Sequence, residues 1–291
     1  MKTPALLSTG LLLAIALSAQ AFDLDGALKS VQEATQPAPS TPTASDSTGT
    51  PLPPINLKKP SREDEIRLGR EIAGNLLGAA PLVRDEKLQK YVNQVGRWVA
   101  LQSERPDLPW HFGVIESDDL NAFAAPGGWV LVTKGLYRQL NNEAELAGVV
   151  GHEIGHVVKK HQLKVIQKQQ LLSYGAGLLG GTLGKDNQTV QQLIGSGAEI
   201  CARSLDKDAE FEADRIGIVL AGRAGYDPYG LVEVLQTIGH AGKDDSRVAL
   251  LFKTHPHPDE RLTKLGDAAG YRLDAIKDGK VLTERFYLLK N

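Results

Sequence analysis

His152, Glu153 and His156 combine residue types and a spacing that suit a metal ion. They form the pattern His-Glu-x-x-His, and residues four apart lie on one face of an α-helix, about 40° out of register. Both imidazoles can therefore reach one ion, and zinc binds histidine nitrogen at roughly 2.0–2.1 Å. Glu153 projects on the flank, where it can act as a general base toward a water molecule. The alternative is a helix with two surface histidines and a solvated glutamate, and the flanking residues argue against it.

Those flanking residues predict a helix around the motif. Asn141 and Asn142 supply capping amides, and Glu143 and Glu145 suit a first helical turn. Apolar residues then recur at helical spacing, which predicts a buried face: Leu146, Val149, Val150 and Ile154.

Two glycines interrupt this predicted helix. Gly151 and Gly155 each cost about 1 kcal/mol in a helix interior. We expect the backbone of another element to pack closely against the motif and to compensate for that cost.

A third ligand is needed, because a catalytic zinc usually has three protein ligands and a water. Glu210 and Asp214 lie four apart on a helix predicted over residues 206–220. One carboxylate can ligate the metal, and the other can accept the free ring N–H of a ligating histidine. Alone, this spacing is more typical of a solvated helix face; beside the zinc motif, the ligand interpretation is favoured.

Other histidines are weaker candidates. His161 would lie about 140° round a continuing helix from His156, so we expect it to point elsewhere, as a surface residue or as a supporting contact. His111 and His240 are isolated in the sequence, and we interpret them as structural.

Composition excludes several classes of protein. The 291 residues carry a net charge of −2, so no strong attraction to nucleic acid is expected. Cys201 is the only cysteine, which excludes an intrachain disulfide and a cysteine metal cluster.

The N-terminus predicts a signal peptide over residues 1–21. Lys2 precedes an apolar run over residues 6–17, and Ala-Gln-Ala at 19–21 fits a cleavage site. The alternative is an uncleaved signal anchor. The expected localisation is a bacterial periplasm. Membrane association is expected to be peripheral at most, and the outer membrane is the candidate for it.

A linker is expected after the signal peptide. Residues 22–59 are rich in Pro, Ser and Thr, most clearly over 36–54, and such segments bury too little apolar surface to fold. The folded domain is predicted over residues 60–291, where Ser61 and Asp64 resemble a capping box.

The remaining patterns predict an α+β fold that is mainly helical, with a small β-sheet beside the metal-binding helix. An exposed edge strand there could hold an extended peptide, and we expect the substrate along residues 128–133; the alternative is a covered edge without a ligand. Residues 171–183 predict a buried helix pair or a flap. The predicted elements are helices at 62–77, 85–102 and 188–200, strands at 110–116 and 128–133, and one or two strands within 270–291.

At this point the chain resembles metallopeptidase family forty-eight, which includes the CAAX prenyl endopeptidases, the HtpX-type proteases and the periplasmic BepA- and LoiP-like proteases. The likeness covers roughly residues 61–270. It is carried by residues 121–124 (Asn-Ala-Phe-Ala), Gly128, 151–156, 210–214 (Glu-Phe-Glu-Ala-Asp), and 254–258 (Thr-His-Pro-His-Pro) with Arg261.

The resemblance implies a zincin (gluzincin) fold and one Zn²⁺ per chain. It implies that His152, His156 and Glu210 bind the zinc, that Glu153 is the catalytic base and that Asp214 orients a ligating histidine. The membrane spans of two branches and the tetratricopeptide tail of BepA do not match this sequence, so prenylated substrates and repeat-bound partners are not implied.

The resemblance also implies a latent form. In BepA-like members the histidine that matches His255 can occupy the open position of the metal, and four protein ligands close a zinc site. The spacing favours His255 over His257 without excluding the latter.

We therefore expect a periplasmic zinc metalloendopeptidase that hydrolyses unfolded or outer-membrane proteins in quality control. One alternative is a chaperone-like peptide-binding zinc protein with little protease activity. Another is a zinc hydrolase that acts on cell-wall peptides.

Overall fold

The computed structural model describes residues 57, 59–169, 206–241, 245–255, 257–273 and 278–289. The predicted signal peptide, nearly all of the predicted linker and the predicted segments 171–183 and 188–200 lie outside the described residues. Leu57 is buried in the core, and its carbonyl accepts a hydrogen bond from the Gln167 side chain at 2.8 Å. The packed part of the chain therefore includes Leu57, three residues before the predicted domain start.

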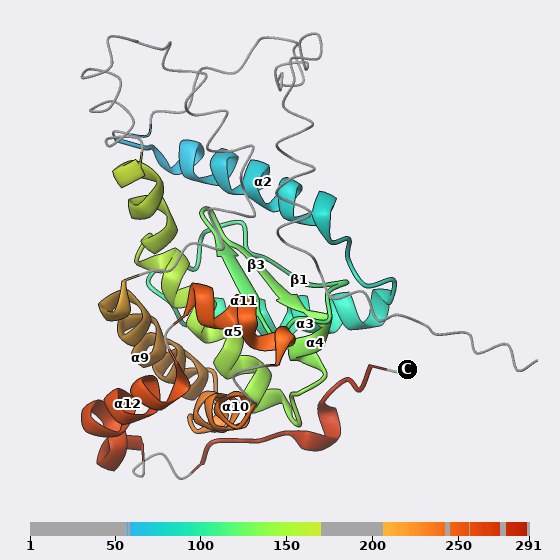
Figure 1. Cartoon of the computed structure of the whole chain (residues 1–291), viewed down its shortest axis with the longest axis vertical. Coiled ribbons are helices and arrows are strands. Elements are labelled where there is room, and N and C mark those ends of the chain that lie inside the picture. The colour runs from blue at the N-terminus through green and yellow to red at the C-terminus, as the bar shows by residue number, and fades with distance from the viewer. Residues whose placement is uncertain are drawn as a thin grey trace, which may run out of the picture.

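The described residues are mainly helical and contain one small mixed sheet, as predicted (Figure 1). The strands are β1 (His111–Ile115), β2 (Ala122–Ala125) and β3 (Trp129–Thr133). The helices are α2 (Arg62–Ala79), α3 (Glu86–Ala100), α4 (Lys134–Tyr137), α5 (Glu143–Val158), α9 (Lys207–Arg223), α10 (Gly230–Gly239), α11 (Ser246–Thr254) and α12 (Pro258–Leu273).

The three strands lie in the order β1-β3-β2, with β3 parallel to β1 and antiparallel to β2. The expectation that a substrate lies along a sheet edge at residues 128–133 is therefore wrong, because β3 is the central strand and both of its sides are paired. The two edge strands are β1 and β2, and β2 was not predicted. Its residues are Ala-Phe-Ala-Ala, and alanine is depleted in strands.

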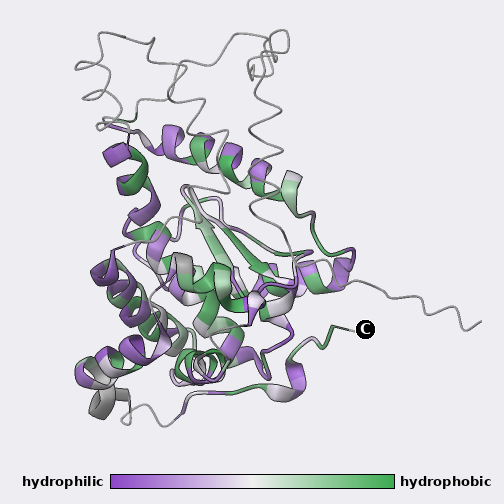
Figure 2. Ribbon diagram, viewed as in Figure 1, coloured by the Kyte–Doolittle hydropathy of each residue, from purple (hydrophilic) through white to green (hydrophobic). Residues whose placement is uncertain are grey.

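Both faces of the sheet are buried, which explains why β3 has no polar residue before Thr133. Val130 and Val132 face the larger core cluster with α3 and α5, whereas Leu131 joins the cluster on the side of α2. Figure 2 shows hydrophobic residues in the strands and in α5, and hydrophilic residues on the outer turns of α2, α9 and α12.

Helix starts follow the predicted caps. Ser61 and Asp64 form the expected capping box at α2: the Asp64 N–H donates to Ser61 Oγ at 3.0 Å, and the Ser61 N–H donates to the Asp64 carboxylate at 3.2 Å. At α5, Asn142 Oδ1 accepts from the Glu145 N–H at 2.9 Å, and the Glu145 carboxylate accepts from the Asn142 side chain at 3.0 Å. These reciprocal bonds fix where the metal-motif helix begins.

The metal-motif helix α5 is buried along its whole length. Its closest neighbour is α9, and the predicted close backbone contact at the two glycines is confirmed. A Cβ at Gly151 would lie 2.8 Å from the Gly217 carbonyl oxygen, and one at Gly155 would lie 3.1 Å from the Ala213 Cα. The glycines therefore allow α9 to approach the face that carries the motif.

The expectation of strands within residues 270–291 is wrong for the residues that the structure describes. α12 continues to Leu273, and a short 3₁₀ helix follows at Thr283–Arg285. This segment is anchored by Arg285, which pairs with the buried Glu143 of α5, and by an isolated bridge between Tyr226 and Lys280. Among the described residues, no helix combines the length and apolar character needed to cross a membrane.

Candidate metal centre

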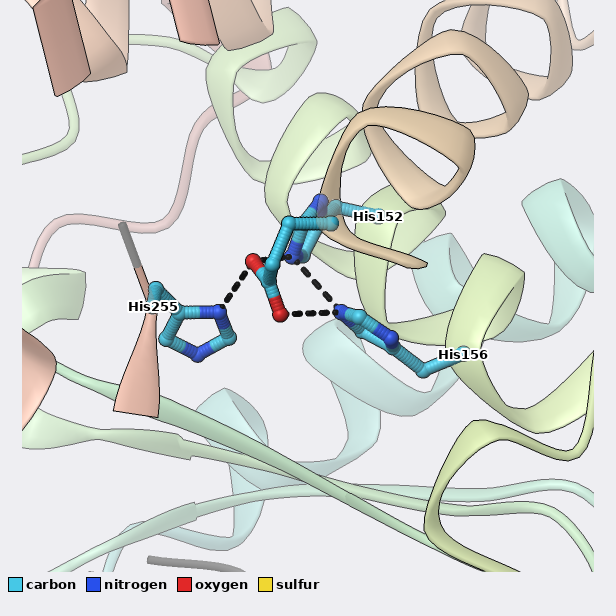
Figure 3. A group of neighbouring side chains, drawn as sticks. His152, His156 and His255 are labelled. Atoms are coloured by element: carbon cyan, nitrogen blue, oxygen red, sulfur yellow. Dashed lines mark hydrogen bonds and ion pairs between the residues drawn. The ribbon is translucent and has the colours of Figure 1, made fainter. Parts of the chain in front are cut away.

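The two motif histidines lie side by side on α5 (Figure 3). The Nε2 atoms of His152 and His156 are 3.0 Å apart, and both side chains are buried. Two nitrogen atoms that converge in this way, each with an available lone pair, can share one ion, as their spacing predicted.

Glu210 from α9 completes the group. Its Oε2 is 3.6 Å from His152 Nε2, and its Oε1 is 3.4 Å from His156 Nε2. The carboxylate is fully buried, and Oε1 has no hydrogen-bond partner. A buried carboxylate oxygen without a partner is costly, and a cation between these three side chains would satisfy it. The residues present therefore fit a metal ion.

His255 lies directly against the same carboxylate, immediately after the end of α11. Its Nδ1 is 2.6 Å from Glu210 Oε2, and one ligand atom from each of the four residues lies within 4.8 Å of all the others. The structure thus brings together His152, His156, Glu210 and His255. His257 is not in this group; it is partly exposed and lies 3.3 Å from Asp259.

The charges of these groups depend on one another. Burial alone would raise the pKa of Glu210, but electrostatic interactions with His255, and then with His156, hold that pKa well below its usual value. Burial alone would lower the pKa of His255, but the Glu210 charge and hydrogen bond raise it. Glu210 and His255 therefore stabilise each other's charged forms.

Asp214 stands behind His152. Its Oδ1 accepts from His152 Nδ1 at 2.8 Å, so the other ring nitrogen of His152 remains free to face Glu210. Arg261 from α12 donates to both Asp214 oxygens, at 2.9 and 2.5 Å. Burial would raise the pKa of Asp214, but the Arg261 charge holds it far below its usual value. Asp214 is therefore held as an anion against the Nδ1 side of the His152 ring.

Glu153 is buried beside the cluster. Burial raises the pKa of its carboxyl above the usual value, and the charges of His152 and His255 partly oppose that shift. A pocket opens against Glu153 and His152. Its walls are mostly apolar and come from five elements: Ala122, Leu136, Val149, Leu231, Val234, Leu235, Ile238 and Leu251, with His255 and Arg261 at the polar end.

The expectation that His161 points away from the metal motif is wrong, whereas its alternative interpretation as a supporting contact agrees with the structure. α5 ends at Val158, and Lys160 adopts a left-handed conformation with φ of 59°. This turn brings His161 back under the motif, where its Nδ1 lies 2.9 Å from His156 Nδ1. The 140° estimate assumed an unbroken helix. Lys159 and Lys160, cations that favour the C-terminus of a helix, are a sequence signal against that assumption.

The two isolated histidines lie apart from the metal group. His111 stacks on Trp129 with ring centroids 4.2 Å apart. His240 hydrogen-bonds the Gln236 carbonyl at 2.6 Å and is exposed.

A mainly helical domain with a small mixed sheet, and with a buried cluster of histidine and glutamate side chains, is consistent with a metallopeptidase. The model of Peptidase family M48 matches residues 86–269, and the chain belongs to this family.

Individual relatives agree. The chain is 32% identical over 233 residues to the beta-barrel assembly-enhancing protease of Escherichia coli, covering 78% of this chain and 47% of that protein. It is 30% identical over 183 residues to the metalloprotease YcaL of Escherichia coli, covering 62% of this chain and 71% of that protein. It is 29% identical over 191 residues to the mitochondrial metalloendopeptidase OMA1 of Arabidopsis thaliana, covering 63% of this chain and 36% of that protein. The chain thus spans less than half the length of the assembly-enhancing protease.

Proposed function

We propose that this protein is a zinc-dependent metalloendopeptidase of the gluzincin type that cleaves misfolded or misassembled envelope proteins in the periplasm. The observation that carries the proposal is the buried group of His152, His156 and Glu210 with Glu153 beside it. Membership of the peptidase family supports the reaction class.

Each residue of the group has a proposed role. His152, His156 and Glu210 would hold one zinc ion, a donor set that zinc accepts, and Asp214 would keep His152 in the tautomer whose Nε2 faces the ion. Zinc, when bound, supplies a Lewis acid that polarises the scissile carbonyl and activates water near neutral pH.

Glu153 would transfer the protons. Its carboxylate accepts a proton from the attacking water and later delivers it to the nitrogen of the leaving amine. Burial raises the pKa of Glu153, which brings it nearer to the working pH and suits both directions of transfer.

His255 would make the resting protein latent. Its contact with Glu210 at 2.6 Å places an imidazole where a substrate carbonyl would need room. His255 must therefore move before a peptide can enter, and the short segment between α11 and α12 that carries it provides the place for that movement.

The substrate class is inferred from the relatives. One is named for enhancing β-barrel assembly, which suggests unfolded outer-membrane proteins as substrates here. The predicted signal peptide supports a periplasmic location, and the net charge of −2 gives no reason to expect nucleic acid as a partner.

The test is the Glu153→Gln variant, made in a His255→Ala parent that is not latent and assayed on casein and on an unfolded outer-membrane protein. The variant should keep its zinc and lose cleavage by at least about 100-fold. Cleavage at the parent rate would contradict the proposal.

A chaperone-like binding protein is the second candidate, because the Glu210–His255 contact would suit a permanently closed site. His255→Ala separates the two. Cleavage gained by that change supports a latent protease, whereas zinc and peptide binding without cleavage in either form supports the binding protein.

A further inference from the structure

The two histidines of the metal motif are supported in different ways on the side away from the ion. His152 contacts a carboxylate directly, through Asp214 at 2.8 Å. Among the residues that the structure describes, no carboxylate contacts His156 Nδ1. It contacts a second imidazole instead, that of His161, at 2.9 Å between the two Nδ1 atoms.

The contact between His156 and His161 determines which ring nitrogen of each histidine carries the hydrogen. The Nε2 atom of His156 faces His152 and Glu210, so it must be the unprotonated nitrogen when it ligates a metal. Its Nδ1 then carries the hydrogen and donates to the lone pair on His161 Nδ1. The remaining hydrogen of a neutral His161 is therefore on Nε2, which lies 3.2 Å from Glu212 Oε2. Every donor in the series has an acceptor.

The backbone around His161 is held for this contact. Lys160 adopts the left-handed conformation, which is strained for a non-glycine residue. Its ammonium group lies 3.0 Å from the buried Glu65 of α2, and Arg105 pairs with that carboxylate as well. His161 itself is 4% exposed. The turn that returns His161 to His156 is thus fixed by partners from elsewhere in the fold.

Glu212 is placed by the helix that supplies the metal ligand. It follows Glu210 by two residues on α9 and therefore points to a different face of that helix. Its side chain is 39% exposed, and the Lys159 ammonium group lies 3.9 Å from its carboxylate. The single helix α9 thus provides three carboxylates to the site. Glu210 faces the metal position, Asp214 contacts His152 Nδ1, and Glu212 contacts His161 Nε2.

We propose that His161 and Glu212 are positioning residues that hold His156 in the Nδ1–H tautomer, and that they set the affinity and geometry of the metal centre. The inference rests on the proposed function only in that a zinc ion binds this cluster. Groups that support a ligating histidine in this way typically change metal affinity by about 10–100-fold when they are removed.

The test measures metal binding directly, in the full chain and in the Glu153→Gln background, so that no proteolysis is involved. His161→Phe keeps a planar ring but has no acceptor, and His161→Asn retains an oxygen near the position of Nδ1. Zinc affinity is measured by competition with a chromophoric chelator, and ligand geometry by the visible absorption of the cobalt-loaded protein. We expect His161→Phe to bind zinc about 10–100-fold more weakly with a changed cobalt spectrum, and His161→Asn to recover part of the affinity.

Two further variants make the result specific. Glu212→Gln removes the charge from a partly exposed site that does not threaten folding, and it should weaken zinc binding by about threefold or more. His240→Phe, an exposed histidine outside the site, should leave both readouts at the parent values. The free energy of unfolding is also measured for each metal-free variant. A variant that loses zinc affinity but keeps the parent's free energy of unfolding has lost support for the metal, not packing.

The proposal is overturned if His161→Phe keeps the parent zinc affinity and cobalt spectrum. If His161→Phe does not fold, Glu212→Gln decides the matter, and an unchanged affinity in that variant overturns the proposal. If the variants bind zinc as expected, but a His255→Ala protein with Glu153 intact binds zinc and cleaves nothing, the proposed function is contradicted and this inference stands.

Discussion

Asp214 is the residue whose role is most directly testable at the metal centre, since its buried carboxylate joins His152 to Arg261. Asp214→Asn keeps the shape but removes the charge. We expect zinc affinity to fall by about 10–100-fold because His152 loses the acceptor that fixes its tautomer. The free energy of unfolding should also fall, because Arg261 remains buried without its partner. Asp259→Asn on the exposed side of α12 is the control, and a similar loss of affinity there would refute the assignment.

Glu65 gives a prediction about pH. Its carboxylate is 1% exposed. Burial alone would raise its pKa, but the hydrogen bonds and charges of Arg105 and Lys160 lower it below the usual 4.5. A lowered pKa in the folded state means that the ionised group stabilises the fold above about pH 4.5 and that this contribution is lost as the pH falls through the folded value.

Glu65→Gln should therefore lower the free energy of unfolding by about 3 kcal/mol at pH 7. The difference from the parent should shrink steadily when denaturant titrations are repeated below pH 4.5. Glu63→Gln, an exposed change in the same turn of α2, should cost less than about 0.5 kcal/mol at every pH. A Glu65→Gln difference that does not depend on pH would show that packing, not charge, is what the residue contributes.

For single residues, the sequence predicts side-chain positions correctly where the spacing along one helix determines them. His152 and His156 converge as their four-residue spacing predicts, and Glu210 joins them; their roles as ligands stay predictions. The prediction failed for His161, because the direction of that side chain depends on the left-handed Lys160, and Lys160 is held by Glu65 from a distant helix. No local pattern contains that contact.

The contact between α5 and α9 is the element-scale feature on which the site depends. It brings Glu210 to the motif histidines, and it requires Gly151 and Gly217 to face each other without side chains. Gly151→Ala would place a Cβ 2.8 Å from the Gly217 carbonyl oxygen. Since backbone atoms cannot move aside cheaply, we expect a loss of about 1–3 kcal/mol in the free energy of unfolding, together with weaker metal binding.

Gly74→Ala is the matched control for this prediction. Gly74 lies within α2, and a Cβ there would meet nothing within 4 Å. The change should leave metal binding unaltered and stabilise the protein by up to about 1 kcal/mol, because alanine favours the helix. If Gly151→Ala behaved like Gly74→Ala in both measurements, close helix approach would not be what the glycine provides.

Elements were predictable in proportion to their length and periodicity. The helices around residues 62–77, 85–102 and 206–220 are confirmed within a few residues as α2, α3 and α9. The helices α10 and α11 and the strand β2 were missed. The first two are short, and β2 is rich in alanine; such segments adopt their structure through the neighbours that bury them, which a single segment does not reveal.

At the scale of the whole molecule, the pocket beside Glu153 is assembled from β2, α4, α5, α10 and α11, so sequence patterns could not show it. Its apolar walls suit an aliphatic side chain next to the scissile bond. Leu251→Ala should enlarge the pocket and shift cleavage toward larger residues, with a change of about tenfold in the relative kcat/KM of paired peptides that differ at that position. The shift is measured by sequencing the products of an unfolded substrate.

Leu250 provides the control for the pocket. It precedes Leu251 on α11 and is equally buried, at 7% exposure, but it packs in the core cluster on the side of α2. Both alanine variants, made in the His255→Ala background, should lose a similar free energy of unfolding, about 2–5 kcal/mol. Only Leu251→Ala should change the residue preferred at the cleavage site. The same shift in both variants would mean that general loosening, not the pocket wall, determines specificity, and no shift in either would remove the pocket from the substrate path.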